Sequence, residues 1–392
     1  MTYICRMKGF IKQKIRKQLI TESRVPFKLV LPSNILAIQA VFKQNGFKLY
    51  VVGGAVRDAL LGRQPKDFDL ATDAVPDTVE TIMAKAGFRT LPTGKSFGVI
   101  NVFTNKDEYE IATFRSDSST GDGRRPDAVT FTDIETDVKR RDLTINALFF
   151  DIDTNEIVDL VGGISDLQKG IIRTVGSPIE RFTEDKLRIL RAIRFAGRFG
   201  SDLDPEIDAA LQRDAGLEGI SGERIRDEFI KGITSAKSVK HFLEMLDRYH
   251  LFNWIFKGLH VNKNFIEDRD ALIVISVLLK GNTQAVLNKQ LNALKYTVDE
   301  IKGVTFLLNL LQLSPETAVV LKRQEKNAGV TLAQIFDFGK REGIKLNLLT
   351  AFGRFRLTVS GEDVMQKFGL KPGKQLGDMI NKLETDNFIK SL

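Results

Sequence analysis

The sequence predicts an α+β protein whose N-terminal part contains a sheet and whose remainder is helical. Two β-rich runs, Phe97–Phe103 and Tyr109–Arg115, flank a polar turn and have the pattern of a hairpin. From about residue 166 onward, apolar residues recur at helical spacing and glycines mark the breaks between segments. With 392 residues, the chain is long enough for about two to four domains.

Composition narrows the class of protein. Hydrophobic residues make up 43% and charged residues 28% of the chain, as in ordinary globular proteins. No apolar run reaches the roughly 18 residues that a membrane-spanning helix requires. The single cysteine, Cys5, excludes an internal disulfide and fits a reducing compartment. The formal net charge of +8 suggests an anionic partner such as nucleic acid, although many solvated surfaces are also basic.

Part of this charge lies in a basic N-terminal segment, residues 1–25, whose first 20 residues contain no Asp or Glu. A basic, acid-free start is also typical of a targeting segment. Lysine outnumbers arginine here, whereas transit peptides favour arginine and serine. We therefore expect a cytoplasmic protein, with a mitochondrial location as the alternative if this segment is a targeting signal.

Residues 47–72 carry the principal candidate site. The apolar run Leu49–Val52 suits a short buried strand, and the pair Gly53-Gly54 ends it. Glycine lets the backbone approach a ligand closely, and a helix that starts after Gly54 would offer free N–H groups to an anion. Arg57 would add a side-chain clamp on a phosphate. Taken alone, the glycine pair favours an ordinary strand–turn–helix corner.

Two acids follow this turn. Asp67 and Asp69 are two residues apart, so in a strand both carboxylates would project from the same face. Like charges this close repel unless a cation lies between them, and Mg²⁺ prefers carboxylate oxygens together with substrate phosphates. A lone Asp-x-Asp on a surface strand is usually only solvated. In combination with the glycine turn and Arg57, the two acids predict a site of metal-assisted nucleotidyl transfer.

The elements around this site follow the same rules. Apolar residues at helical spacing predict an amphipathic helix over 34–46, and 76–86 predict another. Alternation along the second run of the hairpin places Glu110 on its polar face, where it is a candidate third carboxylate. A solvent-facing glutamate on an edge strand fits that pattern equally well. The polar residues 116–126 predict a loop, and Val129–Thr132 predict a short strand.

The basic run Lys139–Arg141 is followed by Asp142 and by the apolar residues that surround Asn146. This pattern suits the start of a surface helix. It would equally suit a site that holds a triphosphate or a ribose.

A second patterned segment spans residues 184–195. Arg188, Arg191 and Arg194 recur every three residues beside an apolar helical face. Asp185 and Arg188, three residues apart, could form only a salt bridge within the helix. Alternatively, the two side chains supply an acceptor and a forked donor that can hydrogen-bond a base edge as another base would. Arg191 and Arg194 would then face phosphates.

Taken in order, these motifs resemble the class II tRNA nucleotidyltransferases, the group that contains the CCA-adding enzymes and the bacterial poly(A) polymerases. The matching segments are GGAVRDALLG (53–62), DFD (67–69), YEIATFR (109–115), RRDLTINAL (140–148), EDKLRILRAIRF (184–195) and SGERIRDEF (221–229), with a weaker match at 359–377. The resemblance implies a nucleotidyltransferase head with a mixed five-stranded sheet and an all-helical neck, body and tail. We expect these four parts at residues 26–160, 161–235, 236–330 and 331–392.

The resemblance also implies roles for individual residues. Asp67 and Asp69 would hold two Mg²⁺ ions, with Glu110 assisting the catalysis. The nucleotide-binding residues would be Gly53, Gly54, Arg57, Arg141, Asp142, Asn146, Asp185, Arg188, Arg191 and Arg194. Asp185 and Arg188 would select C or A by its Watson–Crick edge without a nucleic-acid template. The loop 116–126 resembles the mobile loop that helps to switch specificity from CTP to ATP, and the tail would bind tRNA.

We therefore expect an enzyme that adds C, C and A to the 3′ end of tRNA, with CTP and ATP as substrates, two Mg²⁺ ions as cofactors and the tRNA acceptor arm as partner. The first alternative is a sibling activity, either A-addition alone or poly(A) synthesis. The segment LPTGKSFGVINVF (91–103) resembles the CCA-adding type more closely than the polymerase type. A non-catalytic RNA-binding protein on the same fold is the second alternative, and the intact Asp67, Asp69 and Asp185 argue against it.

Overall fold

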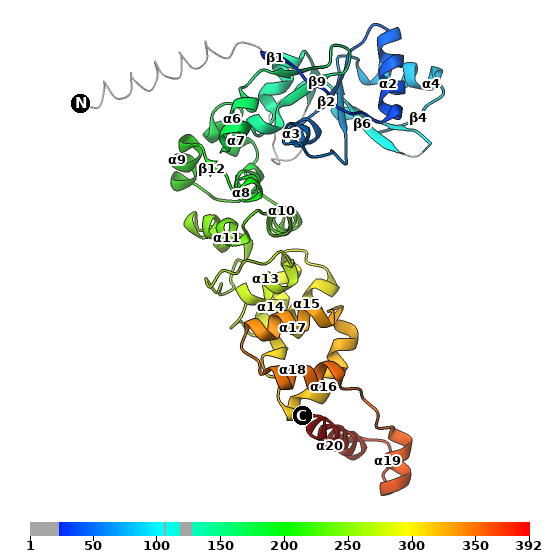
Figure 1. The fold of residues 1–392 in the computed structure, drawn as a ribbon, viewed down its shortest axis with the longest axis vertical. Helices are drawn as coiled ribbons and strands as arrows, with labels where there is room; N and C mark the ends of the chain where they lie inside the picture. Colours follow the sequence, from blue (N-terminus) through cyan, green and yellow to red (C-terminus); the bar gives the residue numbers. More distant parts are fainter. Residues whose placement is uncertain (1–22, 106, 118–127) are drawn as a thin grey trace, which may run out of the picture. The chain divides into compact units, whose positions relative to one another are not determined.

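The computed structural model describes residues 23–105, 107–117 and 128–392 (Figure 1). Most of the basic N-terminal segment and most of the loop 116–126 lie outside the described residues. The chain forms two compact units, Met1–Ile220 and Ser221–Leu392. No helix among the described residues is both long enough and apolar enough to span a membrane. The predicted boundaries between head, neck, body and tail stay predictions.

The first unit is built on an eight-stranded mixed sheet. Its strands are β1 (Ser23–Pro26), β2 (Leu49–Val52), β3 (Asp69–Thr72), β4 (Arg89–Gly94), β5 (Val99–Phe103), β6 (Glu108–Thr113), β9 (Leu148–Asp151) and β10 (Glu156–Asp159). The strand order is β1-β10-β9-β2-β3-β6-β5-β4. Neighbouring strands run antiparallel, except β3 and β6, which run parallel. The predicted hairpin is confirmed as β5 and β6.

The α+β class and the mixed sheet are confirmed, but the predicted number of five strands is wrong. Five strands, β4, β5, β6, β3 and β2, do form a continuous part of the sheet. The hairpin β9–β10 pairs with the remaining edge of β2, and β1 then pairs with β10. Strand β1 starts at Ser23, so the sheet already includes the last residues of the segment 1–25.

Two helices, α2 (Ser33–Gln44) and α4 (Pro76–Lys85), cover one face of this sheet and confirm the two predicted helices (Figure 1). Ile38 and Phe42 of α2 and Met83 of α4 are fully buried in the core on that face. The opposite face carries a cluster of aromatic rings. The centre of the Tyr50 ring lies 5.6 Å from that of Phe114 and 6.3 Å from that of Phe149. Alternation along β2 and β3 therefore separates a helix-covered face from a face that carries the candidate site.

The first unit contains further helices, two small strand pairs and three 3₁₀ turns. They are α3 (Gly54–Leu60), α5 (Ile134–Asp137), α6 (Gly163–Lys169), α7 (Pro178–Glu184), α8 (Leu187–Phe199), α9 (Pro205–Arg213), the antiparallel pair β7 (Arg115–Asp117) and β8 (Val129–Phe131), the parallel pair β11 (Ile171–Ile172) and β12 (Asp202–Leu203), and the 3₁₀ turns Lys95–Phe97, Val138–Arg140 and Thr144–Asn146. Strands β11 and β12 correct the expectation of an all-helical neck. Arg173 Nε donates to Asp204 Oδ2 at 2.9 Å directly beyond this pair and holds the two strands together.

The segment after Asp142 is also not the helix start that its charges suggested. A 3₁₀ turn, Thr144–Asn146, leads directly into β9. All four residues of β9 are buried, and the adjacent Phe149 and Phe150 pack on opposite faces of the sheet. Bulky aromatic residues favour a pleated strand that is buried on both faces over a surface helix.

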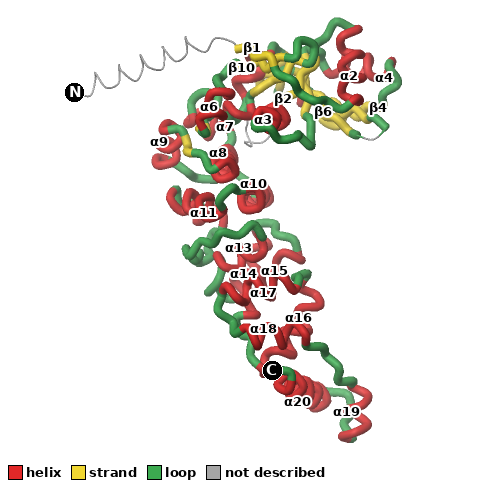
Figure 2. The backbone as a smooth tube through the Cα atoms, in the orientation of Figure 1, coloured by secondary structure: helices red, strands yellow, loops and turns green. Residues whose placement is uncertain are grey.

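The second unit, in which every residue is described, is entirely helical (Figure 2). Its helices are α10 (Gly222–Ser235), α11 (Val239–Arg248), α12 (Phe252–Ile255), α13 (Ala271–Leu278), α14 (Gln284–Ala293), α15 (Val298–Leu310), α16 (Pro315–Ala328), α17 (Leu332–Arg341), α18 (Leu346–Arg354), α19 (Gly361–Phe368) and α20 (Lys374–Lys390). Fully buried Phe338, Phe352 and Phe388 join α17, α18 and α20 in one apolar core.

Candidate active site

The predicted strand–turn–helix at residues 49–60 is confirmed as β2, Gly53 and α3. Gly53 has a φ of +68°, a conformation that side chains with a Cβ rarely adopt. A Cβ on Gly53 would lie 3.6 Å from the carbonyl oxygen of Asn146, an ordinary van der Waals contact, so the positive φ is what favours glycine here. The Gly53 N–H donates to the Leu148 carbonyl at 3.0 Å, so this turn is fixed against the start of β9.

Arg57 lies directly beneath this turn, and its side chain is only 4% exposed. Its Nε donates to Asp58 Oδ1 at 2.9 Å, and its Nη1 donates to Asn146 Oδ1. The guanidinium also lies 5.1 and 5.6 Å from the ring centres of Phe195 and Phe199. Burial lowers the pKa of Arg57. In this conformation Arg57 supports the turn from inside the protein, and its contact with a triphosphate stays a prediction.

The acid next to Arg57 connects the turn to α8. Asp58 accepts a hydrogen bond from Arg198 Nη2 at 3.2 Å. It also forms an ion pair with Arg57, whose Nη2 lies 2.9 Å from Asp58 Oδ1. Asp58 and Arg198 were missed by the sequence reasoning. The only available signal was the position of Asp58 inside the GGAVRD motif.

A second connection starts at Asp142. Its Oδ2 accepts from Nε and Nη2 of Arg191 at 2.7 and 2.6 Å, and its Oδ1 accepts from Asn146 Nδ2 at 3.4 Å. Burial alone would raise the pKa of Asp142, but the charge and hydrogen bonds of Arg191 outweigh it and the pKa is lowered. The structure thus brings together Asp142, Asn146 and Arg191, three of the predicted nucleotide-binding residues, and engages them with one another.

The two candidate metal ligands lie at the start of β3. Asp69 is the first residue of the strand, whereas Asp67 precedes it, so the expectation that both lie within a strand is half correct. Both side chains are exposed, and within the described parts of the chain neither makes a hydrogen bond or an ion pair. Partial dehydration raises the pKa of Asp69, the charge of Asp67 raises it further, and Arg141 opposes both effects. Asp67 and Asp69 are therefore close, repelling carboxylates with free oxygen atoms, which is the donor set that Mg²⁺ prefers.

Glu110 lies on the strand beside them. Leu70 of β3 pairs with Ile111 of β6 in parallel register, which makes Asp69 and Glu110 neighbours across the two strands. Leu70 and Ile111 point into the core under α2 and α4, so Asp69 and Glu110 face the other way. Across the described residues, however, no three His, Cys, Asp or Glu side chains gather closely enough to hold a metal ion. The assisting role of Glu110 stays a prediction.

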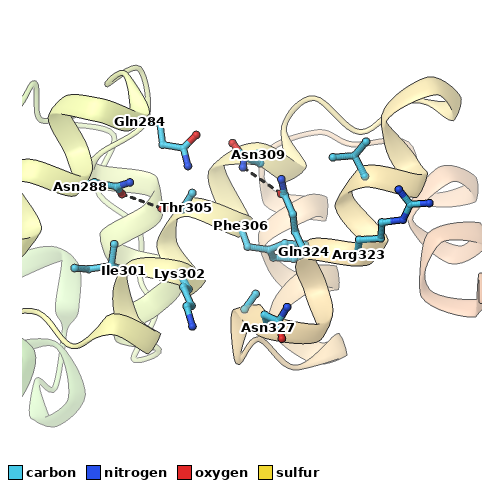
Figure 3. Close-up of a pocket in the computed structure, with 12 residues that line it drawn as sticks. Gln284, Asn288, Ile301, Lys302, Thr305, Phe306, Asn309, Arg323, Gln324 and Asn327 are labelled. Atoms are coloured by element: carbon cyan, nitrogen blue, oxygen red, sulfur yellow. Dashed lines mark hydrogen bonds between the residues drawn. The ribbon is translucent and has the colours of Figure 1, made fainter. Parts of the chain in front are cut away.

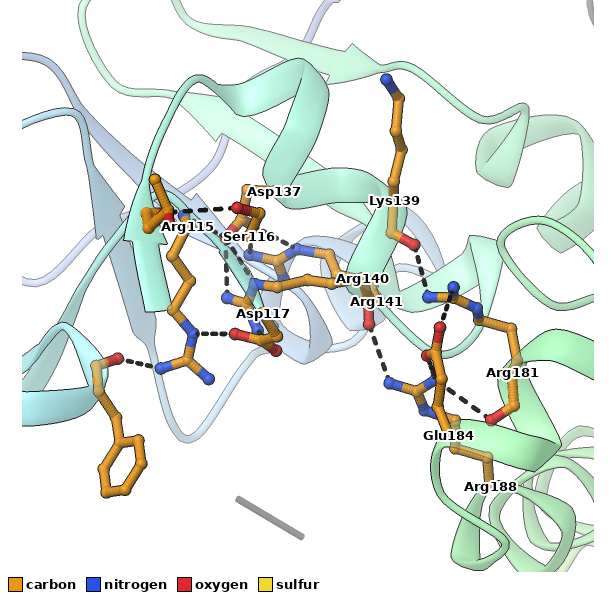
Figure 4. Close-up of polar contacts among 12 residues, drawn as sticks. Arg115, Ser116, Asp117, Asp137, Lys139, Arg140, Arg141, Arg181, Glu184 and Arg188 are labelled. Carbon is orange, nitrogen blue, oxygen red and sulfur yellow. Dashed lines mark hydrogen bonds and ion pairs between the residues drawn. The ribbon is translucent and has the colours of Figure 1, made fainter. Parts of the chain in front are cut away.

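Arg141 is held next to these carboxylates by a buried acid (Figure 4). Asp137, with 1% exposure, accepts from Arg141 Nε at 3.1 Å and from Arg140 Nε at 2.9 Å. Asp137 also accepts from the backbone N–H of Arg115 at 3.2 Å. The Arg141 guanidinium lies 4.5 Å from the ring centre of Phe149, and burial lowers the pKa of Arg141.

Arg188 is anchored at the N-terminal end of α8 (Figure 4). Its Nη1 pairs with Glu184 Oε2 at 2.6 Å, and its Nη2 donates to the Arg140 carbonyl at 3.1 Å. Arg188 thus forms an ion pair with Glu184. Asp185 Oδ1 accepts a hydrogen bond from the backbone N–H of Leu187 at 3.0 Å.

The arginine that ends this series is placed differently. Arg194 is 8% exposed and lies 4.2 Å from the ring centre of Phe195. Arg191 and Arg194 were predicted to face phosphates. In this conformation one pairs with Asp142 and the other is buried, so both phosphate contacts stay predictions.

The sequence and the fold of this chain are similar to those of known proteins. A family model of the poly A polymerase head domain matches residues 49–173, and a model described as a probable RNA and SrmB-binding site of polymerase A matches residues 201–262. A CCA-adding enzyme of Ligilactobacillus salivarius is 34% identical over 92% of this chain and 92% of its own length.

Two solved structures are similar over most of the chain. The Bacillus stearothermophilus CCA-adding enzyme in complex with CTP is 27% identical, with a TM-score of 0.66 over 91% of this chain and 92% of its own. The Thermotoga maritima CCA-adding enzyme complexed with tRNA_CCA shares the fold at 22% identity, with a TM-score of 0.67 over 92% of both chains. The identity over nearly the whole length, together with the head-domain match across β2 to β11, shows that this chain belongs to the class II CCA-adding enzyme family.

Proposed function

We propose that this protein adds C, C and A to the 3′ end of tRNA, with CTP and ATP as substrates. The observation that carries the proposal is the pair of free carboxylates, Asp67 and Asp69, on the sheet face next to the Gly53-Gly54 turn in a chain of this family. Nucleotidyl transfer from a triphosphate to a 3′-hydroxyl needs such a site for cations and phosphates.

Asp67 and Asp69 would hold two Mg²⁺ ions, with Glu110 beside Asp69. When bound, such ions supply charge stabilisation of the attacking and leaving oxygens. The protein's own contribution is orientation. The buried Arg57 and the glycine turn shape the backbone near the phosphates, and Arg141 places a cation close enough to oppose the rise in the pKa of Asp69 that burial causes.

Nucleotide choice is assigned to Asp185 and Arg188. Arg188 Nη1 is fixed by Glu184 and by the Arg181 carbonyl at 3.3 Å, which gives the guanidinium a defined position at the end of α8. A defined donor beside the Asp185 carboxylate can read the Watson–Crick edge of C or A. Arg191 and Arg194 would support that helix.

The tRNA acceptor arm would bind basic surfaces of the helical half, the tail included, mainly through its phosphates. The reaction takes place where tRNA matures, and the single cysteine suits a reducing compartment, so we assign the protein to the cytoplasm. A targeting role of the basic N-terminal segment would instead place it in mitochondria.

Incubation of the pure protein with tRNA that lacks CCA, and with each nucleotide separately, tests the proposal. We expect CMP to be added first and AMP only after two C residues. Incorporation of AMP alone would indicate an A-adding enzyme, and repeated AMP addition would indicate a poly(A) polymerase. No incorporation of CMP under any condition would refute the assignment.

A further inference from the structure

A pocket far in sequence from the catalytic residues lies among three helices of the second unit (Figure 3). It has a volume of about 470 Å³ and is lined by residues of α14, α15 and α16. Ile301, Thr305 and Asn309 recur every four residues along α15 and therefore form one stripe along this helix. The helices α14 and α16 flank the stripe, which makes a groove rather than a flat surface.

The charges on the pocket have one sign. Its lining, all of it within the described residues, contains Lys302 and Arg323 and no Asp or Glu. Neither cation makes a hydrogen bond or an ion pair with any described residue. The neighbouring Lys322 differs, because its Nζ donates to the Phe352 carbonyl at 3.1 Å and pairs with Glu325 at 2.5 Å. Lys302 and Arg323, on two different helices, are thus available to an anion.

The remaining polar groups are side-chain amides. Asn309 Nδ2 donates to Gln324 Oε1 at 3.2 Å, and Asn288 Oδ1 accepts from Thr305 at 3.4 Å. Each amide carries two donor hydrogens and an acceptor oxygen, so these single bonds leave donors and acceptors unused. Phe306 lines the same pocket and adds an aromatic ring to it (Figure 3). A ligand with an anionic end and a flat ring that offers paired donors and acceptors matches all three features.

We propose that this pocket binds one nucleoside monophosphate unit, with the phosphate held by Lys302 and Arg323 and the base edge on the side-chain amides of Asn288, Asn309 and Gln324. The volume of about 470 Å³ is in the range of pockets for ligands of this size. A free mononucleotide and a nucleotide of a bound RNA strand share this chemistry. None of the residues that line the pocket is a catalytic residue, so the proposal does not depend on which nucleotides the enzyme adds.

Photocrosslinking of the full chain, followed by mass spectrometry of its peptides, tests the proposal. The probes are 8-azido-AMP and a tRNA transcript that contains 4-thiouridine. We expect at least one probe to label peptides of α14–α16, and the double variant Lys302→Ala/Arg323→Ala to reduce that labelling about tenfold or more. The matched control is Lys326→Ala, which removes an exposed cation of the same helix that does not line the pocket and should leave the labelling unchanged.

The two probes separate the sources of the ligand. Labelling by 8-azido-AMP assigns the pocket to a free mononucleotide, whereas labelling by the tRNA transcript alone assigns it to a nucleotide of the RNA. Labelling of peptides from α8 provides an internal reference that the double variant should not change. The proposal is overturned if neither probe labels α14–α16, or if the double variant is labelled like Lys326→Ala.

Discussion

Asp58→Asn is expected to destabilise the first unit by about 3 kcal/mol. Asp58 is the anion between two arginines, with Arg57 Nε and Nη2 both at 2.9 Å and Arg198 Nη2 at 3.2 Å. The Arg57 side chain is 4% exposed and that of Asp58 21%, so water can replace the lost carboxylate only in part. Loss of one partner of a buried ion pair costs about 3–5 kcal/mol. The asparagine side chain still offers one acceptor oxygen, and Arg57 keeps its hydrogen bond to Asn146. The expected loss of stability therefore lies at the lower end of that range.

Asp227→Asn is the matched control, because Arg226 and Asp227 repeat the same Arg-Asp order on α10. Arg226 Nη2 lies 2.8 Å from Asp227 Oδ1, but the Asp227 side chain is 43% exposed. An ion pair that reaches the solvent contributes less than about 1 kcal/mol. The two substitutions therefore remove the same chemical group from the same local sequence, and they differ in burial and in the second arginine, Arg198, that Asp58 holds.

Hydrogen exchange followed by mass spectrometry on the full chain measures both effects, because peptides of α3 and α8 are read separately from those of the second unit. A loss of about 3 kcal/mol accelerates exchange through global opening by about 150-fold. We expect this acceleration in α3 and α8 for Asp58→Asn and no change in the second unit. If Asp58→Asn and Asp227→Asn differ by less than about 0.5 kcal/mol, the inferred importance of the buried link is wrong.

Three further predictions concern the catalytic face. Asp69→Asn should lower single-turnover CMP incorporation by about 100-fold or more while tRNA affinity, measured by filter binding, stays unchanged; normal incorporation would refute the metal assignment. Arg188→Ala should reduce discrimination between CTP and UTP about tenfold, and a parallel loss of tRNA affinity would contradict its role in nucleotide choice. The pKa of Asp142 is lowered by Arg191, so this pair stabilises the fold above the ordinary Asp pKa of about 4 and loses its effect as the pH falls through the lowered value. The stability difference between the wild type and Asp142→Asn, measured by urea unfolding, should therefore stay constant from about pH 7 down to about pH 4 and shrink below it; a difference that stays constant below about pH 4 would contradict this.

The local sequence pattern was sufficient to predict most of the secondary structure around the site. The strand Leu49–Val52 and the hairpin of β5 and β6 lie where apolar runs and turn residues predicted them, because each is specified by residues next to it in the chain. The start of α3 at Gly54 follows from the positive φ of Gly53. Residues 148–151 were not recognised as a strand, since a short apolar run buried on both faces has the same composition as a buried helix.

Partners of charged side chains were not predictable in the same way. Arg57 meets Asn146 across 89 residues, and Arg198 meets Asp58 across 140 residues. Spacing along the chain carries no information about such contacts. It allowed an ion pair between Asp185 and Arg188 but did not single out Glu184, the last residue of α7, which pairs with Arg188 across the break between α7 and α8.

These contacts divide the charged residues of the site into two groups that the sequence could not separate. Arg57, Asp142 and Arg191 are buried or engaged with protein partners, and the resulting contacts fix the glycine turn to α8. Asp67 and Asp69 make no ion pair or hydrogen bond within the described residues and repel each other. A protein tolerates uncompensated charge of this kind at a site where a ligand supplies the compensation. The unpaired carboxylates are therefore the part of the site that awaits cations and phosphates, and the paired residues are the part that holds it in shape.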